Sequence, residues 1–201
     1  MNGRVRLAGA GAIAGGLLWS AAIVVQQAGS YLEPRSGAGF FVVQAIVLLA
    51  CAGFLVGVQG LDWARAVGAG RFGRWSVRAF EVGIALEILA SAMILATRSD
   101  ESPLFPLGGV VMAVAGVLTG VAAIRAAVLT GWQRLAALLV GLYFLLGMVV
   151  PTIFVPGDAG PPPVLEIVWG ATGLLLGLAL LTASPAPPVA ARAPGLTGTE
   201  G

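Results

Sequence analysis

Six apolar runs of about 20 residues, separated by short polar connections, constrain this chain more than any other feature of its sequence. A helix rises about 1.5 Å per residue and the hydrocarbon core of a bilayer is about 30 Å thick, so one such run makes one crossing. The sequence therefore predicts an all-α fold, a polytopic bundle of six transmembrane helices. The expected spans are Leu7–Gln26, Gly39–Val58, Ala79–Thr97, Leu107–Ile124, Leu135–Val155 and Val164–Thr182.

The composition agrees with a membrane protein. Hydrophobic residues make up 58% of the chain and charged residues only 10%, against about 25% charged in an average soluble domain. There is no histidine and only one cysteine, Cys51, which removes the usual general base, the usual zinc ligands and any disulfide. Clustered carboxylates and a serine-centred motif are also missing. We therefore expect no metal, no cofactor and no enzymatic activity.

The two ends of the chain need separate interpretation. Arg4 and Arg6 precede the first apolar run, as in a signal peptide, but a run of about 19 residues is longer than the roughly 7–15 of a signal core, so we expect a retained span. Residues 183–201 are rich in Pro, Ala, Gly and Thr without an apolar period. The expected organisation is a transmembrane domain over residues 1–182 and a disordered cytoplasmic tail over residues 183–201.

The arginines predict the orientation of the bundle. All 11 basic residues are arginine, and nine of them fall on one side of the predicted spans: Arg4, Arg6, Arg65, Arg71, Arg74, Arg78, Arg125, Arg134 and Arg192. The other side holds Arg35 and Arg98. Because arginine-rich connections stay in the cytoplasm, we expect both termini inside and the connections at Glu33, Asp100 and Asp158 outside. The exclusive use of arginine is typical of a high-G+C bacterial genome, and we expect the bacterial cytoplasmic membrane.

The longest basic connection, from Gln59 to Arg78, mixes arginine with aromatic residues. This mixture suits a segment that lies on anionic lipid headgroups, and glycines within it disfavour a rigid helix that would read nucleic acid. We expect lipid headgroup contacts and no nucleic acid partner. The side chains assigned to these contacts are Arg65, Arg71, Arg74, Arg78 and Trp75. The five tryptophans, Trp19, Trp63, Trp75, Trp132 and Trp169, fall mostly near span boundaries, as an interfacial belt would.

Glycines spaced four apart recur in the predicted spans. Small residues let membrane helices approach closely, because lipid gives no hydrophobic drive for helices to associate. These pairs predict a tight bundle, and they also offer faces for a membrane-protein partner or a second copy of the chain. The pairs are Gly11 and Gly15, Gly53 and Gly57, Gly116 and Gly120, and Gly173 and Gly177. In the fifth span Pro151 predicts a kink, because its ring removes one backbone hydrogen bond.

Glu87 lies well inside a predicted span, about 12 Å from its inner end at 1.5 Å per residue. A charge centred in a bilayer costs about 2.5–3.5 kcal/mol on insertion scales, so such a residue is a candidate functional group. Tyr143 lies at similar depth, and Ser91 lies one turn from Glu87 on the same helix face. We expect these three to bind a substrate or a proton. The alternative is a neutral Glu87 that is hydrogen-bonded to another span.

Glu81 is a weaker candidate. It lies close to Arg78 at the membrane boundary, which predicts a surface ion pair. Six residues turn Glu81 and Glu87 about 120° apart on a helix, so we do not expect them to form one paired-carboxylate site.

The last third of the chain resembles that of uncharacterised small six-span integral membrane proteins of high-G+C bacteria. The resemblance lies in Gly131-Trp132-Gln133-Arg134-Leu135, then Leu142-Tyr143-Phe144 and later Pro151, which are similar to the penultimate span of those proteins. It implies a six-span fold and no particular activity.

Two functions follow as hypotheses. Short loops and few polar residues in the spans favour a structural or accessory component of the membrane. The carboxyl of Glu87 favours the alternative, a small carrier or proton-coupled permease. A water-accessible cavity that reaches Glu87 would distinguish the second from the first.

Overall fold

The computed structural model describes residues 3–28, 37–98, 102–154 and 162–183. In chain order its helices are α1 (Gly3–Ala28), α2 (Ala38–Trp63), α3 (Arg71–Thr97), α4 (Leu104–Ala126), α5 (Gln133–Tyr143), the π-helix η1 (Phe144–Val149), α6 (Val150–Phe154) and α7 (Pro163–Thr182). The helices α5, η1 and α6 follow one another without a break and together form the fifth span. Six helices are therefore long and apolar enough to cross a membrane, and the described residues contain no strand. The predicted all-α fold is confirmed.

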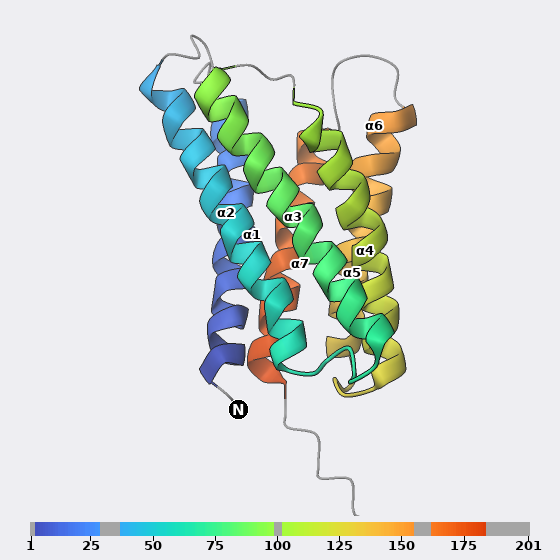
Figure 1. The fold of residues 1–201 in the computed structure, drawn as a ribbon. Coiled ribbons are helices and arrows are strands. Elements are labelled where there is room, and N and C mark those ends of the chain that lie inside the picture. The colour runs from blue at the N-terminus through green and yellow to red at the C-terminus, as the bar shows by residue number, and fades with distance from the viewer. Residues whose placement is uncertain (1–2, 29–36, 99–101, 155–161, 184–201) are drawn as a thin grey trace, which may run out of the picture.

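The six spans stand side by side and alternate in direction (Figure 1). Each packs against the next along the chain, and α7 returns to pack along α1, which closes a ring. One end of the bundle carries the start of α1, the end of α7 and the two connections 64–70 and 127–132. We call it the terminal end, and the opposite one the far end.

Glycines divide the ring into two tightly packed trios. In the first trio, α1 lies between α2 and α7. A Cβ atom added at Gly53 of α2 would lie 2.6 Å from the carbonyl oxygen of Gly11 and 2.8 Å from Cα of Gly15, both on α1. A Cβ atom at Gly177 of α7 would lie 2.9 Å from the backbone nitrogen of Ile13. Only glycine permits this approach, so α1 is held backbone to backbone on both sides.

In the second trio, α4 lies between α3 and the fifth span. A Cβ atom at Gly83 of α3 would lie 2.8 Å from the backbone nitrogen of Met112, and one at Gly116 would lie 2.7 Å from Cα of Gly141. All four glycine pairs predicted from the sequence thus lie at helix contacts within the chain. These glycine faces are covered by neighbouring helices of the same chain. A partner protein or a second copy would have to bind another face.

The third span begins two turns earlier than the sequence indicated. Residues expected as a connection, Gln59 to Arg78, include the last turn of α2, a short turn and the start of α3 at Arg71. Gly73 lies inside this helix and not in a loop. A Cβ atom there would lie 3.0 Å from Cβ of Val67 in the preceding turn, so a larger residue would crowd that turn. Glu87 is consequently about 24 Å from the first residue of α3 and about 15 Å from the last, which places it nearer the far end.

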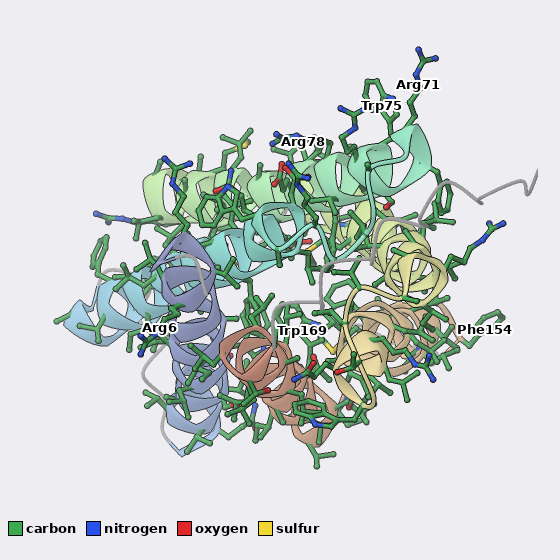
Figure 2. The ribbon with its side chains drawn as sticks, turned by 90° about the horizontal axis from the view of Figure 1, so that it is seen from below. Arg6, Arg71, Trp75, Arg78, Phe154 and Trp169 are labelled. Atoms are coloured by element: carbon green, nitrogen blue, oxygen red, sulfur yellow. The ribbon has the colours of Figure 1, made fainter. Side chains whose placement is uncertain are left out.

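The kink expected at Pro151 takes the form of the π-helix η1 directly before it. Proline has no N–H group and its ring crowds the carbonyl one turn back, and a wider turn accommodates both. Beyond it, α6 packs against η1 and against no other described helix. Phe154, 74% exposed, points away from the bundle (Figure 2). The fifth span therefore leaves the ring at the far end.

Several predictions concern segments outside the described residues. These are Arg35, Arg192, the connections at Glu33, Asp100 and Asp158, and all of the predicted tail except Ala183.

The glycine contacts make a testable prediction. Gly53→Val should destabilise the detergent-solubilised protein by about 1–3 kcal/mol, the usual cost of overpacking, because the new side chain meets the backbone of α1 and the two helices must separate. Thermal unfolding followed by circular dichroism measures the effect. Ala52→Val is the matched control, because Ala52 is the next residue in α2 and its side chain is exposed. An equal loss in both variants would contradict the close contact.

Candidate functional site

A cavity of about 390 Å³ lies between the two trios. Every span contributes to its wall, among them α1 through Trp19, α2 through Cys51 and α7 through Glu166. It extends from the middle of the bundle, at Cys51, to the first turn of α4, at Phe105, near the far end. The cavity is thus a property of the whole ring.

Aromatic side chains form one side of the cavity. Trp169 is at their centre and is only 3% exposed, and in the view along the helices it lies inside the ring (Figure 2). Its ring centroid lies 4.7 Å from that of Trp19, 4.4 Å from that of Phe54 and 5.1 Å from that of Phe144. We call these four residues the aromatic cluster. They come from α1, α2, η1 and α7, so the cluster ties the first trio to the fifth span.

Trp169 departs from the interfacial belt expected of most tryptophans, because its side chain is buried among the helices. The residue is buried because its neighbours in α7 are small: a Cβ atom at Gly173, one turn further on, would lie 3.0 Å from Cζ of Phe54. The absence of a side chain there lets the Phe54 ring lie against α7 beside Trp169. A glycine one turn from a tryptophan was the signal that could have revealed this packing.

Glu87 lies in the cavity wall opposite the first trio. It is 8% exposed, and its Oε1 atom rests against α4, where a Cβ atom added to Gly108 would lie 2.8 Å away. A Cβ atom at the next residue, Gly109, would lie 3.8 Å from Oε1 and 3.7 Å from Cε1 of Phe144. The carboxyl and the aromatic cluster therefore border the same space. Within the described residues no hydrogen bond or ion pair reaches the Glu87 carboxyl.

The structure does not bring Tyr143 and Ser91 to Glu87 in one site. Tyr143 donates a hydrogen bond of 3.0 Å from its hydroxyl to the carbonyl oxygen of Leu165, so it ties α5 to the first turn of α7. Ser91 is 1% exposed, and its hydroxyl has no partner among the described residues. Neither side chain lines the cavity. Of the three predicted residues, only Glu87 does.

The first turn of α7 is held from two directions. Trp19 donates from Nε1 to the carbonyl oxygen of Glu166 at 3.1 Å, and Ser20 donates to that of Ile167 at 3.1 Å. With Tyr143 on the other side, these bonds fix the position of Glu166, a second acidic residue that lines the cavity.

The cavity opens where α6 leaves the ring. Three of its lining residues, Pro106 and Val110 of α4 and Thr152 of α6, are exposed on the protein surface. The Thr152 hydroxyl is engaged by the carbonyl oxygen of Met148 at 2.7 Å, so the opening has apolar edges. The opening thus faces sideways from the bundle, between α4 and the fifth span.

The arginines assigned to lipid headgroups lie mainly on one helix face. Arg71, Trp75 and Arg78 project from the same side of α3 (Figure 2), and with Arg74 they enclose a shallow recess of about 280 Å³. Arg65 is separate from them, in the turn after α2 with φ of 52°.

The surface pair expected between Arg78 and Glu81 is confirmed, since Nη1 and Oε2 lie 2.7 Å apart.

An apolar cavity with a carboxyl in its wall suits binding of a small molecule better than chemistry on one. The described residues contain no group of three or more histidine, cysteine or acidic residues that could hold a metal ion. Comparison with protein-family models, with curated proteins and with solved structures finds no match to the chain.

Cys51, the single cysteine, reports on this cavity. At alkaline pH, where more of the reactive thiolate is present, a small neutral thiol reagent, methyl methanethiosulfonate, should add one methylthio group to Cys51 in the folded protein, because the cavity reaches that residue. Gly109→Leu should slow the reaction several-fold, since its side chain extends into the space between Glu87 and Phe144. Intact-mass spectrometry follows the reaction. Equal rates for Gly109→Leu and the unchanged protein would contradict a cavity that joins Cys51 to the space at Gly109.

Proposed function

We propose that the protein is a small carrier that holds a membrane-soluble molecule in its central cavity, with Glu87 as the polar contact. The cavity is the observation that supports this proposal. Its volume of about 390 Å³ lies within the range of ligand pockets, roughly 300–1,000 Å³. Its wall is mostly apolar with few polar groups, as in sites that bind small molecules.

The size of the cavity argues against a purely structural bundle. Protein interiors are close-packed, and few voids exceed the size of a water molecule. A cavity of about 390 Å³ that is kept open by every span favours an occupant.

Glu87 gives the carrier a means of coupling to protons. A buried polar group without a partner costs stability, and this carboxyl has no partner among the described residues. A carboxyl can release a proton when a ligand group pairs with it and take one up when the ligand leaves. An amide of the same size cannot do this.

The accessory role stays a prediction. Its support in the sequence was the short loops and the few polar residues in the spans. The predicted glycine pairs, which could also have offered faces to a partner, are occupied by helix contacts inside the chain. The contacts within each trio account for the glycines without a partner protein.

We further propose that the bundle lies in the bacterial cytoplasmic membrane with both termini in the cytoplasm. Arginines gather at the terminal end, with Arg65 in the turn after α2, Arg125 in the last turn of α4 and Arg134 at the start of α5, whereas Arg98 follows α3 at the far end. In this orientation the recess lined by Arg71, Arg74, Trp75 and Arg78 meets anionic headgroups on the cytoplasmic side.

The carrier proposal predicts a role for Glu87 in proton movement. In membrane vesicles from cells that express the protein, which retain the cell's own small molecules, Glu87→Gln should slow the decay of an imposed pH gradient. A pH-sensitive dye inside the vesicles measures the decay. Glu81→Gln is the matched control on the same helix, since Glu81 pairs with Arg78 outside the cavity, and it should behave as the unchanged protein. Equal rates for Glu87→Gln and the unchanged protein would exclude a proton-coupled carrier.

The orientation is tested by reporter fusions. A reporter active only in the cytoplasm should work when fused after residue 70 and fail when fused after residue 100, and a periplasmic reporter should show the reverse. Activity of one reporter at both positions would overturn the proposed threading.

A further inference from the structure

The occupant of the cavity can be narrowed by the groups that face it. Two acidic residues, Glu87 and Glu166, are among the residues that line the cavity, and no arginine of the described residues is. Glu87 is more than nine-tenths buried and has no hydrogen-bond or ion-pair partner among the described residues. The charge that complements such a wall is positive.

The aromatic cluster favours the same charge. The face of an aromatic ring carries negative potential, and organic cations bind in cages of such rings. The rings of Trp19, Phe54 and Phe144 surround that of Trp169 at centroid distances of 4.4–5.1 Å. Phe144 and the Glu87 carboxyl flank Gly109 from two sides, each within 4 Å of a Cβ atom built there. A cation at this point lies against the Glu87 carboxyl and beside the Phe144 ring.

The remainder of the wall and the opening define the rest of the ligand. Apart from the two acidic residues, the residues that line the cavity are mainly aliphatic, aromatic or sulfur-containing, such as Ile84, Met112 and Met148. The opening at Val110 and Thr152 lies beside the splayed α6 and faces sideways. A ligand that reaches this opening from the bilayer has an apolar body.

We propose that the cavity binds a lipophilic organic cation, an amine or quaternary ammonium compound with an apolar body, between the Glu87 carboxylate and the aromatic cluster. This rests on the proposed function of the cavity as a binding site. The cation replaces the proton of the Glu87 carboxyl, one charge for one, and leaves the cavity when the proton returns. The carboxyl pairs with the charged group, and the Phe144 ring lies beside its alkyl substituents.

A pair of isosteric probes tests the charge. Phenyltrimethylammonium and tert-butylbenzene have the same shape and differ in one atom, a charged nitrogen in place of carbon. Both are added to the full chain in detergent, and the readout is protection of Cys51 against methyl methanethiosulfonate by intact mass. Because Cys51 lines the same cavity, an occupant shields it. The partition of a given probe into detergent is the same for every variant. For each probe, the ratio of half-protecting concentrations between two variants therefore measures the change in its affinity for the protein.

The expected result is a charge-dependent effect of Glu87. Glu87→Gln should raise the half-protecting concentration of phenyltrimethylammonium by about tenfold or more, since removal of one partner of a buried charge pair is costly, and leave that of tert-butylbenzene unchanged. Glu81→Gln should leave both unchanged, and Glu87→Asp should retain preference for the cation. Thermal unfolding of each variant confirms that it is folded.

Two other outcomes would overturn the inference in different ways. Equal protection by the two probes, insensitive to Glu87→Gln, would show that the cavity binds apolar molecules without selecting a cation, and the carrier proposal would stand without this substrate class. Reaction of Cys51 that neither probe slows would remove the binding site itself, and the proposed function with it.

Discussion

Close approach of helix backbones at glycine is the interaction on which this structure depends. Lipid offers no hydrophobic reward for burying one apolar helix against another, so association relies on van der Waals contact between closely packed surfaces. Gly53 brings α2 onto the backbone of α1, and Gly116 and Gly141 bring α4 onto α5. Among the described glycines, none makes such a backbone contact between α2 and α3 or between α5 and α7. The ring is therefore tight within each trio and looser between the two.

The cavity follows from this uneven packing. It lies along the boundary of the trios, and the aromatic cluster around Trp169 spans that boundary without filling it. At the far end Pro151 and the π-helix before it turn α6 away from α4 and α7, which opens the space to the side. Glu87 of α3 lies at this level, in the wall of a protein-lined space and not on the outer surface of the bundle.

Much of the architecture could be predicted from the sequence, because membrane helices are encoded locally. The length and apolarity of each run define its span without reference to the others, and all six predicted spans correspond to helices. The spacing of Gly11 and Gly15, like that of Gly53 and Gly57, indicated a close contact for the same reason, since residues four apart share a helix face. A single acidic residue within an apolar run, such as Glu87, can likewise be recognised from the sequence alone.

Contacts between spans are a different matter, because they depend on which faces meet and no local pattern records this. The sequence by itself determined the six helices, their small-residue faces and the presence of an acidic residue, Glu87, deep within one of them. Only the tertiary structure decided that Tyr143 binds the backbone of α7 and not Glu87, that Trp169 lies in the core, and that two trios enclose a space. Hydropathy is a property of each residue, whereas a cavity exists only through the volume that side chains from all six spans leave unfilled.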